Sequence, residues 1–255
     1  MPTVIRFNVP HIKGFGLEHP DAIDLTEVGI AEDRRFFLVD ETGRLVDGLI
    51  AGRIVQVAAR TDPEGATLCV TFPDGTVIED EVRPDGAVVT EMYGRTVEGH
   101  FVDGPWAAPL EPFAGRRVRL VRTDETGGSR TAHQATIVGD GSLERLADEL
   151  GTDEIDARRF RMLIDLSGAE PHEEDSWIGR SVEIGEARLL ISAPVPRCAV
   201  TTQDPSVGVR DLDTLRAIKS YRGLRDGLHL DFGVWGEVER PGRIRVGDEV
   251  VVPAS

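Results

Sequence analysis

The sequence is poor in aromatic and basic residues. Only 5% of its 255 residues are aromatic, so Val, Leu, Ile and Ala must fill most of the core. The formal net charge is −16, whereas a protein that binds duplex nucleic acid needs a basic stripe to displace counterions. The sequence contains no Lys/Arg-rich run, so we do not expect nucleic acid as a partner.

Signals for membrane insertion and export are missing as well. No apolar stretch approaches the roughly 20 residues of a membrane span. The first residues, MPTVIRFNVPHIKGF, lack the basic start and long apolar centre of a signal peptide. The chain has two cysteines, Cys69 and Cys198. Without an export signal we expect free thiols, a cytoplasmic protein and no membrane partner.

Familiar catalytic and metal-binding motifs are also absent. The six histidines show neither HxH nor HExxH spacing. The sequence has no GxSxG nucleophile elbow, no P-loop and no GxGxxG after a strand. These absences argue against a zinc site and against a bound nucleotide.

The first hundred residues are typical of short strands separated by turns. Pro73-Asp74-Gly75 is one such turn, because proline presets φ and glycine accepts a positive φ. We predict a β-barrel or sandwich here. The expected strands cover residues 3–7, 34–40, 44–49, 53–60, 66–72, 76–82, 86–92 and 95–104.

The pattern changes near Pro105. Residues 105–115 are predicted to form a helix that ends at a glycine, and residues 142–150 a second helix with Ser142 as its N-cap. Residues 211–221 are predicted to form a third, capped by Asp211 or Asp213. The expected strands cover 117–122, 158–166, 181–185, 187–194 and two pieces within 242–252. We therefore predict a mainly β fold with short helices (α+β), with domains at 1–104 and 105–255.

Cys198 lies in VPRCAVTTQDP, directly after a predicted strand. A neighbouring guanidinium, here Arg197, favours the thiolate, the form that attacks electrophiles or binds soft metals. The alternative is a buried and inert cysteine. Cys69 alternates with Leu68 and Val70 within ATLCVTF, which favours an inert core position.

Two arginine clusters could bind an anion. Asp33-Arg34-Arg35 precedes one predicted strand, and Arg158-Arg159-Phe160-Arg161 opens another. In a strand, Arg159 and Arg161 would share one face, and paired guanidinium groups make bidentate contacts to phosphate. The alternative is surface arginines paired with the many carboxylates.

Read in order, these segments resemble the MOSC family, named from the C-terminal domain of molybdenum-cofactor sulfurase, with its N-terminal β-barrel partner domain. The resemblance is carried by DARRFRMLIDLSG, EEDSWIGRSVEIGEARLLISAPVPRCAVTTQDPSVG, DLDTLRAIKSYR and DFGVWGEVERPGRIRVGDEV. VIRFNVPHIKGFGLEHPDAIDLTEVGIAEDRRFFLVDETGRLV is similar to the start of the partner domain. The implied fold is a MOSC-type β-barrel preceded by a smaller N-terminal β-barrel.

The resemblance implies a bound molybdenum-pyranopterin cofactor. Cys198 matches the family's molybdenum ligand, and a soft thiolate suits a site that dithiolene sulfurs complete. Lys13, Arg34, Arg161 and Arg197 match the positions that hold the pterin phosphate. Thr136 lies where the family supplies a hydroxyl, and Trp235 where an aromatic residue closes the pocket. These positions and Arg159 are our predicted site.

Three positions depart from the family pattern. Leu163 stands where an asparagine contacts the pterin, Gly14 where a serine follows the lysine, and Pro196 where some members have a small polar residue. Each lost hydrogen bond to a charged ligand would cost about 1–3 kcal/mol.

The implied function is an oxidoreductase that reduces N-hydroxylated or N-oxide small molecules. Two cysteines cannot hold an iron–sulfur cluster on four thiolates, so we expect an external ferredoxin- or flavoprotein-like electron donor. Two alternatives stay open. One is a carrier of the cofactor, or of sulfur as a Cys198 persulfide, and the other is a cofactor-free β-barrel interaction module.

Overall fold

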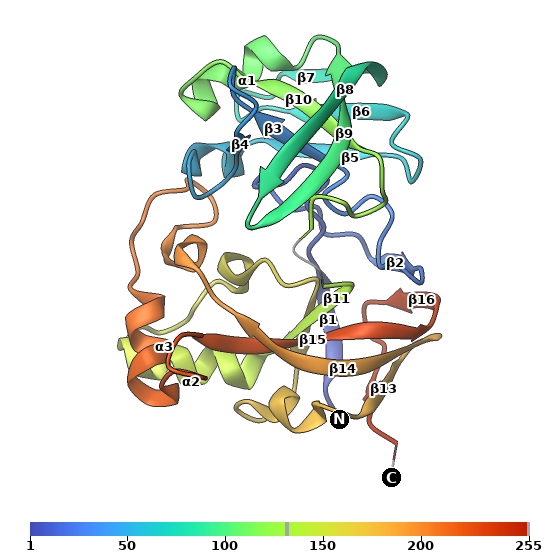
Figure 1. The fold of residues 1–255 in the computed structure, drawn as a ribbon. Helices are drawn as coiled ribbons and strands as arrows, with labels where there is room; N and C mark the ends of the chain where they lie inside the picture. Colours follow the sequence, from blue (N-terminus) through green and yellow to red (C-terminus); the bar gives the residue numbers. More distant parts are fainter. Residues whose placement is uncertain (131–132, 254–255) are drawn as a thin grey trace.

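The computed structural model describes residues 1–130 and 133–253. The chain forms two lobes, an upper and a lower one in Figure 1, each built mainly of strands. The predicted β-rich fold with short helices is confirmed. In the described part of the chain, no helix is both long and apolar enough to cross a membrane.

The lower lobe is a seven-stranded sheet that curls into a nearly closed barrel. Thr3 forms an antiparallel bridge with Glu249, which brings the first and last strands of the sheet together. The strands, in spatial order, are β1 (Thr3–Phe7), β12 (Ile164–Ser167), β11 (Ala135–Gly139), β15 (Asp231–Arg240), β14 (Ala187–Pro196), β13 (Ser181–Ile184) and β17 (Val250–Val251). A small sheet of β2 (Ala22–Leu25) and β16 (Gly242–Arg245) packs beside it.

The upper lobe contains two sheets that share a large apolar core, and a smaller apolar cluster lies on the five-stranded sheet. The five-stranded sheet has the order β4 (Leu45–Val46), β3 (Phe36–Val39), β10 (Arg119–Thr123), β9 (Arg95–Asp103) and β8 (Arg83–Met92). The three-stranded sheet has the order β5 (Ala58–Thr61), β6 (Thr67–Thr71) and β7 (Val77–Glu81). Aromatic side chains are few, and aliphatic residues supply most of this core, as the composition predicts.

Strand pairing links distant parts of the chain. β1 pairs with β12, and β2 pairs with β16, so the first residues of the chain belong to the lower lobe. Conversely, β10 pairs with β3 and β9 in the upper lobe. The domain boundary at 104/105 stays a prediction, and the connections that cross it hold the two lobes together.

Within the described residues, three α-helices flank the sheets, in the regions where the sequence predicts them. They are α1 (Ala107–Ala114), α2 (Asp140–Leu150) and α3 (Thr214–Arg222). α1 ends at Gly115 with φ +68°, and the Asp213 side chain caps α3 by accepting a hydrogen bond from the amide of Arg216. The predicted cap of α2 is wrong. Ser142 lies inside the helix, where its hydroxyl donates to the buried Glu174.

Two predicted strands begin with 3₁₀ turns instead. Residues 53–60 are divided between η1 (Gly52–Gln56) and β5. Residues 158–166 start as η2 (Ala157–Phe160), because the Asp156 side chain caps the turn and Arg161 ends it with a left-handed backbone. The alternating-face argument for Arg159 and Arg161 is therefore wrong, although both side chains reach the same cavity.

The two lobes make a close contact between backbone atoms. Gly52 of η1 and Gly208, in the loop after η4 (Ala199–Thr202), approach so closely that a Cβ on Gly52 would overlap the carbonyl of Gly208. Gln56 Nε2 donates to the carbonyl of Val207 at 3.1 Å. In Figure 1 the loop rises from the lower lobe to the segment after β4.

We expect Gly52→Ala to lower the free energy of unfolding by about 1–3 kcal/mol, because the new methyl group must push the lobes apart. The matched control is Gly48→Ala, where the nearest atom to a Cβ lies at 3.9 Å and φ is outside the left-handed region. That control should change stability by less than about 1 kcal/mol. Chemical denaturation of the three proteins measures both values, and equal losses would contradict the close approach.

Candidate functional site

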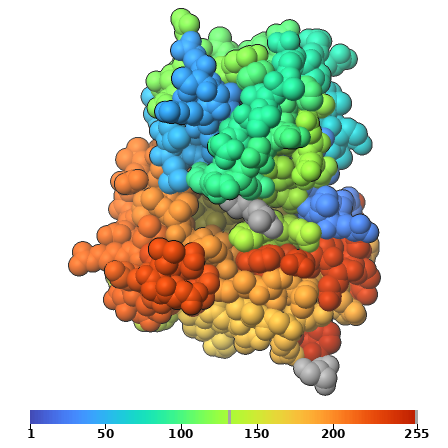
Figure 2. Space-filling view, viewed as in Figure 1, coloured from blue at the N-terminus to red at the C-terminus, as the bar shows by residue number. Residues whose placement is uncertain are grey.

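A cavity of about 340 Å³ lies between the lobes and collects most of the predicted site. Figure 2 shows the upper lobe resting on the lower one, with the β8–β9 hairpin reaching down to their boundary. The predicted residues that line the cavity are Lys13, Arg34, Thr136, Arg159, Arg161, Arg197 and Cys198. They come from both lobes and from widely separated parts of the chain.

Cys198 follows the end of β14 and occupies the position before η4. Its thiol is exposed and unpaired, and its carbonyl accepts a hydrogen bond from the Thr201 hydroxyl at 3.1 Å. Pro194 and Pro196 have no amide hydrogen to donate, and the β14–β15 register shifts beside them. This irregular strand end presents the sulfur to the cavity instead of burying it.

Cys69 differs from its prediction. It is half-buried on β6, whereas Leu68 and Val70 on the opposite face of that strand are buried in the core. Cys69 is therefore a free cysteine on the outer face of the sheet, and it does not line the cavity.

Arg197 lines the cavity but turns its guanidinium inward. Nε donates to the carbonyl of Phe232 at 2.7 Å, and Nη1 donates to the carbonyl of Phe160 at 3.0 Å. Burial lowers the pKa of Arg197 to about 9, and the neighbouring Cys198 opposes that shift. This side chain fixes β15 and η2 around the residue that precedes Cys198, so its geometry favours positioning of the cysteine over contact with a phosphate.

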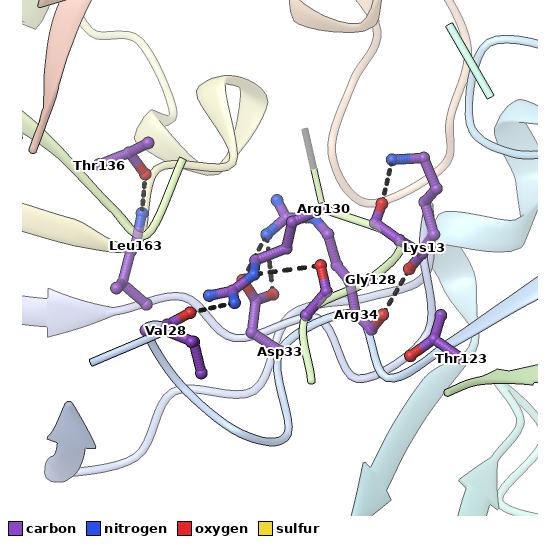
Figure 3. Close-up of polar contacts among 12 residues, drawn as sticks. Lys13, Val28, Asp33, Arg34, Thr123, Gly128, Arg130, Thr136 and Leu163 are labelled. Carbon is purple, nitrogen blue, oxygen red and sulfur yellow. Dashed lines mark hydrogen bonds and ion pairs between the residues drawn. The ribbon is translucent and has the colours of Figure 1, made fainter. Parts of the chain in front are cut away.

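Arg34 and Arg161 have the same unusual backbone. Each has φ +51°, in the left-handed region that non-glycine residues rarely occupy. Arg34 Nη1 donates to both oxygens of Asp33 at 2.7 and 2.8 Å, as Figure 3 shows, and Arg161 Nη2 donates to the carbonyl of Phe15 at 2.7 Å. Strain of this kind is concentrated at functional sites, and here it brings two guanidinium groups together.

Lys13 is buried on the same side of the cavity. Its Nζ donates to the carbonyl of Ser129 at 2.8 Å and lies 5.4 Å from the centre of the Tyr93 ring. Burial, followed by the charge of Arg34, lowers its pKa from 10.5 to about 7. A lysine with this pKa gains a proton when an anion binds beside it.

The side chains of Arg159 and Thr136 already form hydrogen bonds within the protein. The two terminal nitrogens of Arg159 donate to the carboxylate of Asp211, each at 2.6 Å, so this cation is largely neutralised. The hydroxyl of Thr136 accepts a hydrogen bond from the Leu163 amide at 2.8 Å and keeps its own proton for another partner.

Trp235 does not line the cavity directly. It lies on β15 opposite Thr136 of β11, and its ring stacks on His133 with 4.6 Å between ring centres. His133 lines the cavity, and burial lowers its pKa to about 4, so the ring is neutral at physiological pH. Trp235 therefore supports the wall from behind.

The departures from the family pattern have structural reasons. A Cβ at Gly14 would lie 2.7 Å from the amide nitrogen of Gly48, and Gly14 has φ +86°, so the fold leaves no room for a serine. Leu163 is buried in the core of the lower lobe, although it also contributes to the cavity wall. Its amide supplies the bond to Thr136.

Several cavity residues escape prediction from sequence. Asp33, Asp47, Tyr93 and Arg130 all line the cavity, yet none belongs to a motif that identifies it. Asp33 lies next to Arg34 and also approaches Arg130 Nε at 3.9 Å. Asp47 and Tyr93 meet through a hydrogen bond between elements far apart in the chain. Of these four residues, only Asp33 could have been predicted from the sequence, because it is next to Arg34.

The donors in the cavity fit a phosphorylated cofactor better than a free metal ion. Within residues 1–130 and 133–253, no group of three or more His, Cys, Asp or Glu side chains could hold a metal. In the same described part, Arg130 Nη1 and Arg159 Nε are buried without a hydrogen-bond partner. These nitrogens, with Lys13, Arg34 and Arg161, are donors for anionic oxygens, and Cys198 adds one soft ligand.

Several named proteins are similar to this chain at low sequence identity. The chain is 26% identical to mitochondrial amidoxime-reducing component 1 of Mus musculus, over 87% of this chain and 72% of that protein. It is 27% identical to molybdenum cofactor sulfurase 2 of Aedes aegypti, over 81% of this chain but only 27% of that protein. The YUAD protein of Bacillus subtilis matches 98% of this chain and 94% of its own, with 15% identity and a TM-score of 0.45.

The family model for the MOSC domain matches residues 122–251, which contain Cys198, Arg161 and most of the barrel. The predicted resemblance is thus confirmed. This chain belongs to the MOSC domain family.

Proposed function

We propose that this protein binds the molybdenum-pyranopterin cofactor and reduces N-hydroxylated small molecules, using electrons from a separate donor. The observation that carries the proposal is the cavity between the lobes, where an exposed thiol and a group of cations face the same space. Family membership and relatives named for amidoxime reduction support it.

Different residues would bind different parts of the cofactor: cationic side chains its phosphate, and a thiolate its metal. Lys13, Arg34 and Arg161 would hold its phosphate, because ammonium and guanidinium groups form strong hydrogen bonds to phosphate oxygens. Cys198 would ligate molybdenum through its sulfur. The Thr136 hydroxyl proton would contact the pterin, and Arg197 would hold the Cys198 turn in place.

The cofactor, when bound, supplies the two-electron chemistry that protein side chains lack. Reduction of an N–OH group consumes two electrons and two protons, breaks the N–O bond and releases water. The protein's part is to bind the substrate near Cys198. Protons must enter from solvent, and the exposed position of Cys198 leaves that side accessible.

Electrons must come from outside the described site. The chain has two cysteines, whereas an iron–sulfur cluster is held by four thiolates. We therefore propose a ferredoxin- or flavoprotein-like partner as the donor.

A sulfur carrier is the second candidate, favoured by the free and exposed thiol of Cys198. In that role the Cys198 thiolate would attack the outer sulfur of a persulfide on a donor protein, so that the donor's S–S bond breaks, a new S–S bond forms on Cys198 and the donor leaves as a thiol. The named relationship to a molybdenum cofactor sulfurase is consistent with this alternative. Activity with an N-hydroxylated substrate separates the two roles.

We expect Cys198→Ala to abolish reduction of benzamidoxime by an artificial electron donor, because the molybdenum loses its protein ligand. Molybdenum retained through desalting should fall together with the activity. Cys69→Ala is the matched control and should retain both, since Cys69 lies on the outer face of β6. Full activity in Cys198→Ala would refute the assignment of the ligand.

For Arg161→Ala we expect cofactor content to fall about tenfold or more, since a hydrogen bond to a charged ligand contributes about 1.5–3 kcal/mol. The fold should survive, because the main intramolecular contact of the side chain is one backbone carbonyl. Pterin fluorescence and thermal unfolding measure the two effects. Arg60→Ala is the control, since Arg60 pairs with Glu18 on the surface and should alter neither quantity.

Anion binding should weaken as the pH rises through 7. Lys13 has a pKa of about 7, so it is charged below that value and neutral above it. Arg34, Arg161, Arg95 and Asp47 also act on Lys13, and the guanidinium groups among them stay charged over this range. A bound anion raises the lysine pKa, so its affinity should fall about tenfold per pH unit above 7.

Sulfate is a suitable probe because it does not titrate near neutrality. Calorimetric titrations of the full chain between about pH 5.5 and 8 should show the decline in the wild type, and Lys13→Arg should remove it. A wild-type affinity that does not change across this range would show that Lys13 is not part of the anion site.

A further inference from the structure

Among the described residues, one buried carboxylate of the cavity forms no ion pair. Asp47 is only 5% exposed and lines the cavity, and within the described residues it forms no ion pair. Its Oδ1 accepts a hydrogen bond from the Leu49 amide at 3.0 Å, and its Oδ2 accepts one from the Tyr93 hydroxyl. Asp33, by contrast, is neutralised by Arg34 at 2.7 Å.

Asp47 and Tyr93 both lie on the upper wall of the cavity. Asp47 follows β4, and its carbonyl accepts hydrogen bonds from the amides of Ile50 and Ala51. Tyr93 lies at the tip of the β8–β9 hairpin, where it and Gly94 both have positive φ angles, +53° and +80°. This two-residue turn aims the phenol into the cavity, and Figure 1 shows the hairpin descending toward the lower lobe.

Contacts across the lobes bring this carboxylate close to the cysteine turn. Gln203, directly after η4, donates from Nε2 to the carbonyl of Gly48 at 2.9 Å. Gly48 is next to Asp47, and η4 starts next to Cys198. Cys198 is also among the influences that raise the pKa of Tyr93, after burial and the bond to Asp47.

The chemistry of the proposed reaction suggests what an unpaired carboxylate recognises. Reduction of an amidoxime, R–C(NH₂)=N–OH, with two electrons from the external donor and two protons, gives the amidine R–C(NH₂)=NH and water. An amidine is a strong base and carries a positive charge at neutral pH. Its planar pair of N–H donors matches a carboxylate as a guanidinium does. A carboxylate has about four acceptor sites, of which Leu49 and Tyr93 use two.

We infer that Asp47, oriented by Tyr93 and the amide of Leu49, is the specificity-determining residue of the cavity and binds the amidine end of substrate and product. The inference rests on the proposed function and names its substrate class. The cations of the cavity hold the anionic cofactor, and Asp47 supplies the opposite charge for a nitrogen base. The amidoxime substrate is neutral but carries an amino group whose N–H donors Asp47 can accept, so substrates with such an amino group beside the N-hydroxyl group are preferred over N-oxides that have no N–H donor.

The test is calorimetric binding of benzamidine to the full chain, with benzamide as the neutral ligand of similar shape. Asp47→Asn keeps an acceptor for the Leu49 amide, removes the charge and replaces the oxygen that faces Tyr93 with an NH₂ group. We expect it to weaken benzamidine binding about tenfold or more and to leave benzamide unchanged. Tyr93→Phe should weaken benzamidine binding about threefold, because the carboxylate loses its orienting bond.

Asp204→Asn is the matched control. Asp204 also lines the cavity, but its carboxylate accepts from the amides of Ser206 and Val207, and asparagine can keep those bonds. This variant should bind benzamidine as the wild type does. The inference is overturned if the wild type does not bind benzamidine, if Asp47→Asn binds it unchanged, or if that variant loses benzamide equally.

This outcome is independent of the reductase assay. If benzamidine binding depends on Asp47 but the cofactor-loaded protein does not reduce benzamidoxime, the subsite stands and the proposed function fails. If reduction occurs and the affinity for benzamidine is the same in Asp47→Asn as in the wild type, the proposed function stands and this inference fails. In the loaded protein, Asp47→Asn should raise the KM for benzamidoxime more than it changes kcat.

Discussion

Three cationic side chains, those of Lys13, Arg34 and Arg161, share one cavity in a protein of net charge −16. Burial and mutual repulsion oppose this arrangement. For Lys13 the lowered pKa corresponds to about 5 kcal/mol against its charged form. Asp33 offsets Arg34, but within the described residues no carboxylate forms an ion pair with Lys13 or Arg161. An anionic ligand would relieve that repulsion.

The two lobes contribute different functional groups to this cavity. The barrel supplies Cys198 at an irregular strand end, and Arg197 braces that end through backbone carbonyls. The upper lobe supplies Lys13 and Arg34 and, on another part of the wall, Asp47 with Tyr93. The Gly52–Gly208 contact and the hydrogen bond from Gln203 to Gly48 fix their separation. The cavity therefore depends on the whole chain and not on the barrel alone.

Sequence patterns predicted the parts of this arrangement that are local in the chain. Alternating apolar residues located most strands, and Pro196-Arg197-Cys198 located the cysteine at a strand end. Features that depend on tertiary contacts were missed. Asp156 caps a 3₁₀ turn that replaces the expected strand at Arg159, and Arg197 turns toward carbonyls of other elements. Asp47 and Tyr93 meet only because the β8–β9 hairpin folds over the cavity, which no local pattern records.

The central claim is that the charge of this cavity is matched by a phosphorylated molybdenum cofactor. The most direct measurement is the content of molybdenum and pterin in the wild-type protein, purified from a host that synthesises the cofactor. The account predicts about one of each per chain, retained through gel filtration. A folded, monodisperse protein that carries only traces of both would contradict it.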